Sequence, residues 1–177
     1  MNDVVRGRWA GAFDNADFLC VETYSGYRGG VRDHKGKQHL LGPDVSDEIL
    51  GAALLDAMAH SRFVLPARRT DVWQHPEVEF DLDLYDYKLG IERTSEWTKS
   101  LMERYGYKAK RALFKDMKFC SIDWIGDVIT ILPWHHEKLE AWSGDGISAS
   151  DRVVIPANST PAEVGAALRL AFSRCTG

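Results

Sequence analysis

The sequence is poor in cysteine and has no long apolar run. Its 177 residues include three cysteines, Cys20, Cys120 and Cys175, which are far apart and form no Cys-x-x-Cys pair. This spacing argues against a disulfide framework or a zinc site, so we expect buried, reduced thiols. A nucleophilic cysteine with a histidine base is the alternative, but no neighbouring residue supports it. Because the N-terminus has no signal-peptide pattern and no stretch approaches a membrane span, we expect a cytoplasmic protein with no membrane partner.

The chain also lacks an excess of positive charge. It has 22 Lys and Arg against 26 Asp and Glu, a net charge of −4. A chain with this balance does not bind nucleic acid directly through its overall charge. Its 45% hydrophobic and 27% charged residues are typical of a soluble globular protein. The length predicts a single domain spanning residues 1–177.

Sequence motifs of enzymes are missing as well. Residues 25–37 are rich in Gly and basic residues and predict a mobile loop, because neither glycine motif of a phosphate-binding loop is present. There is no nucleophile elbow and no kinase-like set. His135, His136 and Glu137 are adjacent, but neighbouring strand residues point to opposite faces and do not easily share a metal. The other histidines are scattered: His34, His39, His60 and His75. We therefore expect no cofactor, and a small enzyme using His135, His136 or acidic residues, with or without a metal, remains an alternative.

The clearest local pattern is a strand, a turn and a helix over residues 153–175. Thr160 is placed as a helix N-cap, Pro161 occupies the first helical position, and Glu163 completes a capping box. The apolar residues that follow recur at helical spacing, which predicts one buried face. They are Val164, Ala167, Leu168, Ala171 and Phe172, and Cys175 extends the same face.

A second helix, predicted over residues 43–61 with Ser46 as its cap, repeats part of this pattern. Gly51-Ala-Ala-Leu54 with Ala57 matches Gly165-Ala-Ala-Leu168 with Ala171. A glycine inside a helix costs about 1 kcal/mol relative to alanine. Two glycines at matching points therefore predict two helices on one face of a shared sheet that approach each other closely at Gly51 and Gly165.

Further elements are predicted by β-rich runs and turn residues. We expect strands over residues 17–24 and 38–41, a hairpin over 117–133 that turns at Gly126-Asp127, and a helix over 86–107 that ends at Gly106. Residues 1–16 have no strong period and predict no element. Strands and helices without strict alternation predict an α+β fold, a mostly antiparallel central sheet with helices packed on it.

Residues 77–87 form an acidic segment of unusual regularity. Four carboxylates alternate with four apolar residues, so an extended strand would place all four carboxylates on one face. The carboxylates and the aromatic and acidic residues that follow are predicted to bind a basic partner: Glu77, Glu79, Asp81, Asp83, Tyr85, Asp86 and Tyr87. An edge strand kept soluble by its charge is one alternative, and a divalent cation site is another.

The C-terminal third resembles the immunity proteins of bacterial contact-dependent growth inhibition (CDI) systems. The resemblance lies in mostly packing and turn residues, namely Lys118–Cys120, Gly126–Pro133, Trp142–Gly144, Val154–Pro156 and Glu163–Cys175. It implies an inhibitor without catalysis, whose partner is the toxin domain delivered by a neighbouring cell. Such toxins are commonly nucleases and often attack tRNA. An adaptor with an unrelated basic partner is a third hypothesis beside the inhibitor and the enzyme.

Overall fold

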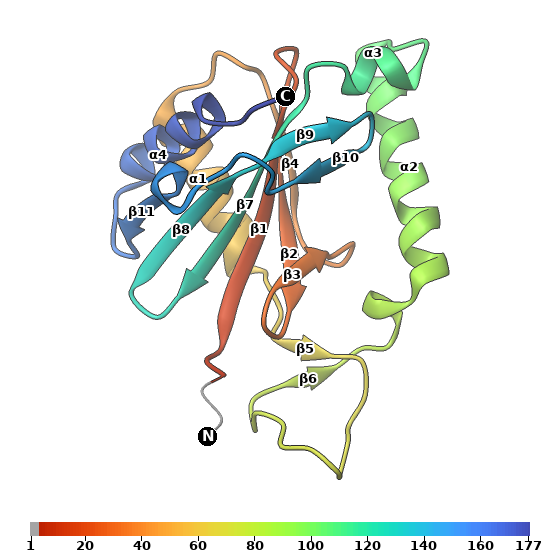
Figure 1. The fold of residues 1–177 in the computed structure, drawn as a ribbon, viewed down its shortest axis with the longest axis vertical. Helices are drawn as coiled ribbons and strands as arrows, with labels where there is room; N and C mark the ends of the chain where they lie inside the picture. Colours follow the sequence, from red (N-terminus) through yellow and green to blue (C-terminus); the bar gives the residue numbers. More distant parts are fainter. Residues whose placement is uncertain (1–3) are drawn as a thin grey trace.

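A seven-stranded sheet forms the centre of the structure (Figure 1). The computed structural model describes residues 4–177; residues 1–3, part of the stretch with no predicted element, lie outside that range. The strand order is β11-β8-β7-β1-β2-β3, with β4 also paired to β2, and every pairing in this sheet is antiparallel. The strands are β1 (Gly7–Asp14), β2 (Leu19–Gly26), β3 (Gly30–Arg32), β4 (Gln38–Leu41), β7 (Lys118–Ile125), β8 (Val128–Pro133) and β11 (Val153–Pro156). The predicted α+β fold is confirmed.

Smaller elements surround this sheet. Two short ladders pair β5 (Val64–Leu65) with β6 (Glu79–Phe80) in parallel and β9 (His135–Lys138) with β10 (Ala141–Ser143) antiparallel. The helices are α1 (Asp47–Ala59), α2 (Tyr87–Tyr105), α3 (Lys110–Phe114) and α4 (Pro161–Ser173), with 3₁₀ turns η1 (Asp83–Tyr85) and η2 (Ala149–Asp151).

Helices α1 and α4 lie together on one face of the sheet and approach each other at two glycines, as predicted (Figure 1). A Cβ atom added to Gly51 would lie 1.7 Å from the Pro161 carbonyl oxygen, and one added to Gly165 would lie 1.8 Å from that of Asp47. These obstacles are backbone atoms, so no side-chain rotation relieves them. Only glycine permits this helix pair to pack at its observed distance.

The predicted helix ends and the hairpin are also confirmed. Ser46 accepts a hydrogen bond from the Ile49 N–H, and Thr160 and Glu163 form the full capping box. Gly106 ends α2 in the left-handed conformation, with φ 74°. Strands β7 and β8 pair around Gly126, whose φ is 61°. Local hydrogen-bonding chemistry determined these positions, so the sequence alone predicted them.

Two predictions for the N-terminal part are wrong. The segment 1–16 contains β1, a central strand that pairs with both β2 and β7. Both faces of β1 are covered, so it shows no alternation of polar and apolar residues. Residues 25–37 contain β3 rather than a structureless loop, and Arg32 pairs with Tyr24 of β2 in register.

The extended acidic strand is a third correction. Only Glu79 and Phe80 are in a strand, and the chain then turns into η1. Leu82 is 65% exposed whereas Leu84 is buried, so the predicted apolar face does not form. The four carboxylates therefore do not line one face, because pairing with the two-residue strand β5 orders only a short part of the segment.

The second face of the sheet packs against α2 and α3. Phe13 of β1 and Cys20 of β2 contact Trp97 and Leu101 of α2 and Phe114 of α3 in a second apolar cluster. The N-terminal half of α2 stands away from the sheet (Figure 1), with Ile91 53% exposed. The sheet is thus covered along α1 and α4 but only partly covered on this side.

Candidate functional site

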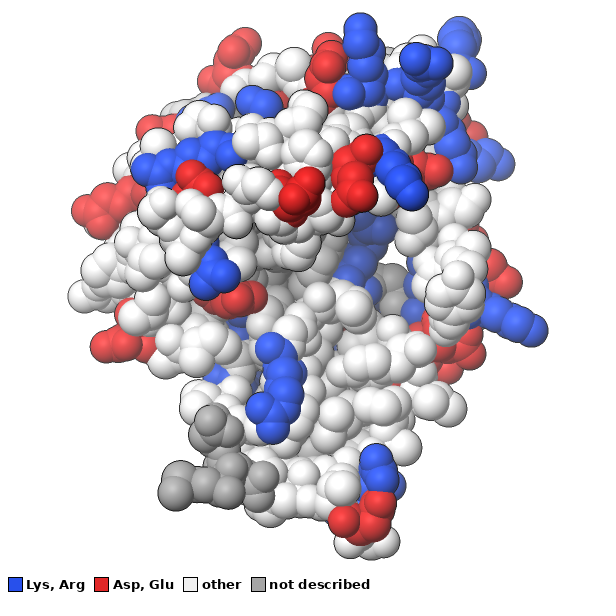
Figure 2. Space-filling view, viewed as in Figure 1, with Lys and Arg blue, Asp and Glu red and all other residues white. Residues whose placement is uncertain are grey.

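A cleft of about 670 Å³ lies between the N-terminal half of α2 and the strand β3. One wall is formed by Val31 and Arg32, the other by η1 and the start of α2, including Tyr87 and Ile91. Figure 2 shows this face as hollowed, with Lys or Arg atoms inside the hollow. Val31 is 47% exposed and Tyr87 is 80% exposed, so large apolar groups face solvent at the cleft. We call this region the α2 cleft. Exposed apolar and aromatic groups beside a hollow are typical of binding surfaces.

Arg32, which lines the α2 cleft, forms a buried ion pair with Glu22 of the neighbouring groove. The Glu22 side chain is 3% exposed, and one of its oxygens accepts a hydrogen bond of 2.6 Å from Arg32 Nε. The other oxygen accepts hydrogen bonds from Gln38 Nε2, at 2.8 Å, and from Trp97 Nε1. The guanidinium of Arg32 lies over the Trp97 ring, 4.0 Å from its centroid. A buried charge is tolerated only when it is paired and hydrogen-bonded, and both conditions are met here.

Aromatic rings line a recess beside this ion pair. The ring of Phe13 lies 5.1 Å from that of Trp97, 4.8 Å from Phe119 and 5.7 Å from Trp142, measured between centroids. The recess of about 210 Å³ shares Arg32, Thr94 and Glu140 with the larger hollow, so the two lie next to each other. A rigid apolar floor with one charged group in it orients whatever binds there.

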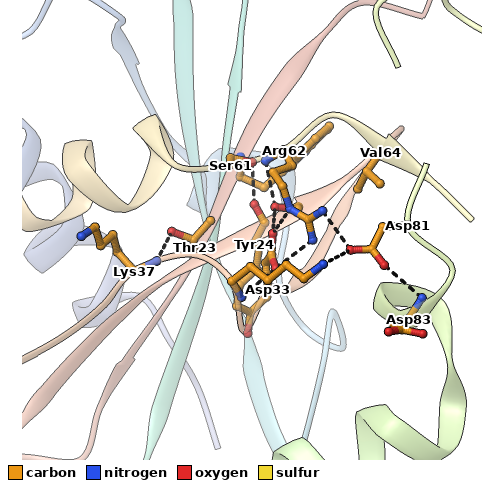
Figure 3. Close-up of polar contacts among 12 residues, drawn as sticks. Thr23, Tyr24, Asp33, Lys37, Ser61, Arg62, Val64, Asp81 and Asp83 are labelled. Atoms are coloured by element: carbon orange, nitrogen blue, oxygen red, sulfur yellow. Dashed lines mark hydrogen bonds and ion pairs between the residues drawn. The ribbon is translucent and has the colours of Figure 1, made fainter. Parts of the chain in front are cut away.

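A second ion-pair network holds η1, which forms part of one wall of the α2 cleft, in place (Figure 3). Arg62 donates to the fully buried Asp33, with Nε 2.7 Å from Oδ2, and its NH1 lies 2.9 Å from Asp81 Oδ2. Lys35 reaches the same Asp81 oxygen at 3.0 Å. The other Asp81 oxygen accepts the Asp83 N–H at 3.1 Å, where η1 begins. The network therefore ties the segment after β3, the segment before β5 and the start of η1 together.

This network sets the charge state of its carboxylates. The hydrogen bond from Lys35, followed by that from Arg62, lowers the pKa of Asp81 to about 2 against the opposing effect of burial. The pKa of Asp33 is also lowered, because hydrogen bonds from Arg62 and Ser25 outweigh its desolvation. Both carboxylates are ionised near neutral pH, as the network requires.

Comparison with known proteins matches the fold to a family. The family model described as CDI immunity protein matches residues 8–175. The chain belongs to the CDI immunity protein family. The immunity protein CdiI-YPIII of Yersinia pseudotuberculosis serotype O:3 is 59% identical over 177 residues, which is all of both chains.

Solved structures match the same fold. A toxin and immunity complex (CdiA-CT/CdiI) from Yersinia pseudotuberculosis contains a chain with a TM-score of 0.96 and 59% identity, covering 98% of this chain and 100% of that one. A protein of unknown function from Neisseria meningitidis matches with a TM-score of 0.81 and 36% identity, covering 99% of both chains. The resemblance inferred from the C-terminal third thus extends over the whole fold.

The residues predicted to bind toxin in this immunity protein fall into three groups. Tyr85, Asp86 and Tyr87 line the α2 cleft. The exposed acidic residues that precede them are Glu77, Glu79 and Asp83. The Asp81 side chain is only 11% exposed and belongs to the Arg62 network, so it does not share the open position of the other three carboxylates.

Two of the cleft residues have structural contacts as well. Asp86 is the N-cap of α2 and accepts the Leu89 N–H at 3.0 Å. The Tyr85 hydroxyl donates to the Val64 carbonyl oxygen at 2.6 Å, although Tyr85 remains 38% exposed. Tyr87 has a larger exposed fraction than Tyr85, so its ring is the more accessible of the two to a partner.

The histidines considered for an enzyme lie apart from the cleft. His135 Nδ1 is 2.9 Å from Thr176 Oγ1, and His136 Nε2 is 3.0 Å from the Leu139 carbonyl oxygen. The His136 ring also stacks on Trp142. Among residues 4–177, no three His, Cys, Asp or Glu side chains gather in a way that could hold a metal ion.

The sequence alone did not identify Glu22, Arg32 or Arg62 as parts of the site. One signal was available, since Glu22 directly follows the apolar run Phe18–Val21 inside the predicted strand 17–24, where a buried charge requires a partner. The partner itself, Arg32, lies in a segment predicted as a loop, and its position depends on the β2–β3 pairing.

Within residues 4–177 the helices are too short or too polar for any of them to cross a lipid bilayer.

Proposed function

We propose that this chain neutralises a cognate toxin domain by binding it at the α2 cleft and at the acidic residues beside the cleft. It acts as an inhibitor and performs no catalytic step. The observation that carries the proposal is the α2 cleft, an open hollow with exposed aromatic and aliphatic side chains in a protein of this family. The similarity to a chain of the Yersinia toxin and immunity complex supports it.

We further infer that the toxin is a basic nuclease, with tRNA as one possible substrate, acting in the cytoplasm. The chain has a net charge of −4, and Glu77, Glu79 and Asp83 are exposed beside the cleft. A nuclease carries a positive surface where it contacts phosphates. Acidic groups on the inhibitor complement that surface and accelerate association.

Co-expression tests the function directly. Cells that express the toxin domain encoded beside this chain should stop growing, and co-expression of the chain should restore growth. Purified toxin and chain should also co-elute as a complex. If the chain neither restores growth nor binds the toxin, the proposed function is wrong.

Charge reversal tests the acidic part of the interface. The triple variant Glu77→Lys, Glu79→Lys, Asp83→Lys should slow association with the toxin about tenfold or more at low salt and reduce its salt dependence. Asp81 is left unchanged because it stabilises the fold through Arg62 and Lys35. The matched control reverses three other exposed carboxylates, at Asp44, Asp127 and Asp145. Equal association rates for both triple variants would remove the acidic residues from the interface.

Truncation of a side chain tests the aromatic part of the proposed interface. Tyr87→Ala removes a largely exposed ring that has no hydrogen-bonded side-chain role among the described residues, so the fold should be retained. An aromatic contact at an interface centre contributes about 2 kcal/mol or more, so dissociation should accelerate about 30-fold. Tyr105→Ala is unsuitable as a control because its ring stacks on Phe18. Val154→Ala, on a strand edge and 61% exposed, is a better one.

A further inference from the structure

The side chain of Arg32 is held along one edge and open along the other. Its Nε donates to Glu22, and its plane is stacked on Trp97. Neither terminal nitrogen, NH1 or NH2, forms a hydrogen bond with residues 4–177 of the chain. No buried side-chain nitrogen or oxygen in that range lacks a partner, so these two nitrogens are accessible from the cleft. Arginine has five N–H donors, and four of them therefore remain available.

The open edge lies in the middle of the site. Arg32 lines the large hollow, the aromatic recess and the groove beside Glu22, and it is the residue that all three share. The two terminal nitrogens of a guanidinium match the two oxygens of a carboxylate, giving a pair of parallel hydrogen bonds. The stacking on Trp97 and the bond to Glu22 hold the plane before any partner arrives, so little side-chain freedom is lost on binding.

Of the lysine and arginine side chains that line the cleft, Arg32 is the one whose two terminal nitrogens both lack a partner among residues 4–177, although its Nε is paired with Glu22. Lys110 lies 3.5 Å from Glu140, and Arg93 donates to the Asp83 carbonyl oxygen. Burial opposes the charge of Arg32, but Glu22 outweighs that effect and raises its pKa, so it stays cationic. The carboxylates of Asp86 and Glu140 also line the cleft, so the open N–H donors of Arg32, rather than an excess of positive charge, are what an anionic group would bind there. Charge complementarity favours an anionic group of a protein partner over the phosphates of a nucleic acid, which the acidic residues outside the cleft would repel.

We propose that the open edge of Arg32 binds the carboxylate of an Asp or Glu side chain of the toxin, inserted into the α2 cleft against the aromatic floor. The proposal rests on the proposed function and adds the anchoring group and its partner. The toxin is then recognised by two opposite charge patterns, a basic surface facing Glu77, Glu79 and Asp83 and an acidic side chain facing Arg32. A partner that offers only a basic surface lacks the second contact, so Arg32 determines specificity.

Arg32→Lys tests the anchor. Lysine keeps a positive charge beside the buried Glu22 but loses the planar fork, with its Nε hydrogen bond and its stacking on Trp97, so some stability is lost as well. We expect the cognate toxin domain to bind this variant about 30-fold more weakly, mainly through faster dissociation, with a melting temperature within a few degrees of wild type. The matched control is Arg8→Lys. Arg8 also lies over a tryptophan, 4.9 Å from the centroid of Trp124, but it is exposed and on the strand face that packs toward α1 and α4. Its substitution should leave toxin binding unchanged.

The toxin side supplies a test that does not depend on the stability of the Arg32 variant. Each Asp and Glu of the toxin is replaced in turn by Asn or Gln, and binding to the wild-type chain is measured. One replacement should weaken binding about as much as Arg32→Lys does. Combined with Arg32→Lys, it should add little further loss, because both changes remove the same contact.

The outcomes separate this inference from the proposed function. If the wild-type chain does not bind the toxin, the proposed function itself fails. If it binds and Arg32→Lys binds equally well, only the anchor is overturned. If Arg32→Lys weakens binding but no toxin carboxylate is coupled to it, Arg32 contacts another group and the carboxylate assignment is wrong. Binding of a single-stranded RNA oligonucleotide to the free chain, lost in Arg32→Lys, would likewise overturn it.

Discussion

Replacing Gly165 by alanine adds one methyl group at the closest point between α1 and α4. The new Cβ would lie 1.8 Å from the Asp47 carbonyl oxygen, whereas ordinary contact begins at 3.4 Å. The two helices must therefore separate locally by about 1.5 Å, because a backbone carbonyl inside a helix has no other way to move.

The size of the stability loss follows from the apolar contacts that this separation weakens. The two helices bury Leu50, Leu54, Val164 and Leu168 against each other and the sheet, each worth roughly 2 kcal/mol of burial. A gap of this size forfeits up to about half of the contact energy, or about 4 kcal/mol in total. Alanine offsets about 1 kcal/mol through its higher helix propensity. We expect Gly165→Ala to lower the free energy of unfolding by about 3 kcal/mol.

Urea unfolding followed by circular dichroism measures this loss of free energy. In a thermal melt of a chain of this size, a loss of 3 kcal/mol corresponds to a fall of about 6–12 °C in melting temperature. Gly90→Ala is the matched control, since Gly90 also lies within a helix but has open space where a Cβ would be added. It should increase stability by roughly 0.5–1 kcal/mol.

The two variants must therefore move in opposite directions. A Gly165→Ala protein as stable as wild type would show that the helices can separate without loss, and the close-approach explanation would be wrong. The larger change Gly165→Leu should leave the chain unfolded or strongly destabilised. A normal melting curve for that variant would contradict the same explanation.

Two further predictions concern titratable groups. The pKa of Asp81 is lowered to about 2, below its unfolded value near 3.9, so Asp81 stabilises the fold at pH values above about 4 and this contribution disappears as the pH falls through about 2. Urea midpoints measured between pH 6 and pH 2 should therefore fall less steeply for Asp81→Asn than for wild type, and parallel curves would show that the Arg62 network does not depend on this charge. The half-buried Cys175 has its pKa lowered to about 7, chiefly by the hydrogen bond from Cys120, whose sulfur is 3.7 Å away. Alkylation by iodoacetamide should reach half its maximal rate near pH 7, and Cys120→Ala should raise that midpoint; an unshifted midpoint would refute the assigned cause.

The acidic segment illustrates where sequence reasoning fails. Alternation over residues 77–84 predicted a strand, but a strand requires a partner to satisfy its backbone groups, and β5 offers only two residues. The chain then leaves the ladder and forms η1, held by Asp81 through Arg62. Because Arg62 and Lys35 lie far from Asp81 in sequence, nothing in the local pattern distinguished this paired carboxylate from its exposed neighbours.

The sequence by itself determined the parts of this protein that depend on local chemistry or on exact spacing. The cap at Thr160, the turn at Gly126 and the matching glycines at 51 and 165 were predicted from the residues and are confirmed by the structure. Each depends on one backbone position, so a short stretch of sequence carries the information.

The α2 cleft was decided only by the tertiary structure. At this cleft Glu22 of β2, Arg32 of β3 and Trp97 of α2 contact one another, and the position of η1 in its wall depends on Arg62. These residues meet because β1, a strand with no readable period, lies between β2 and β7 and joins them in one sheet, whose second face α2 covers incompletely. Strand order and helix placement are long-range properties of the packed chain, and the charged groups at the cleft find their partners through them.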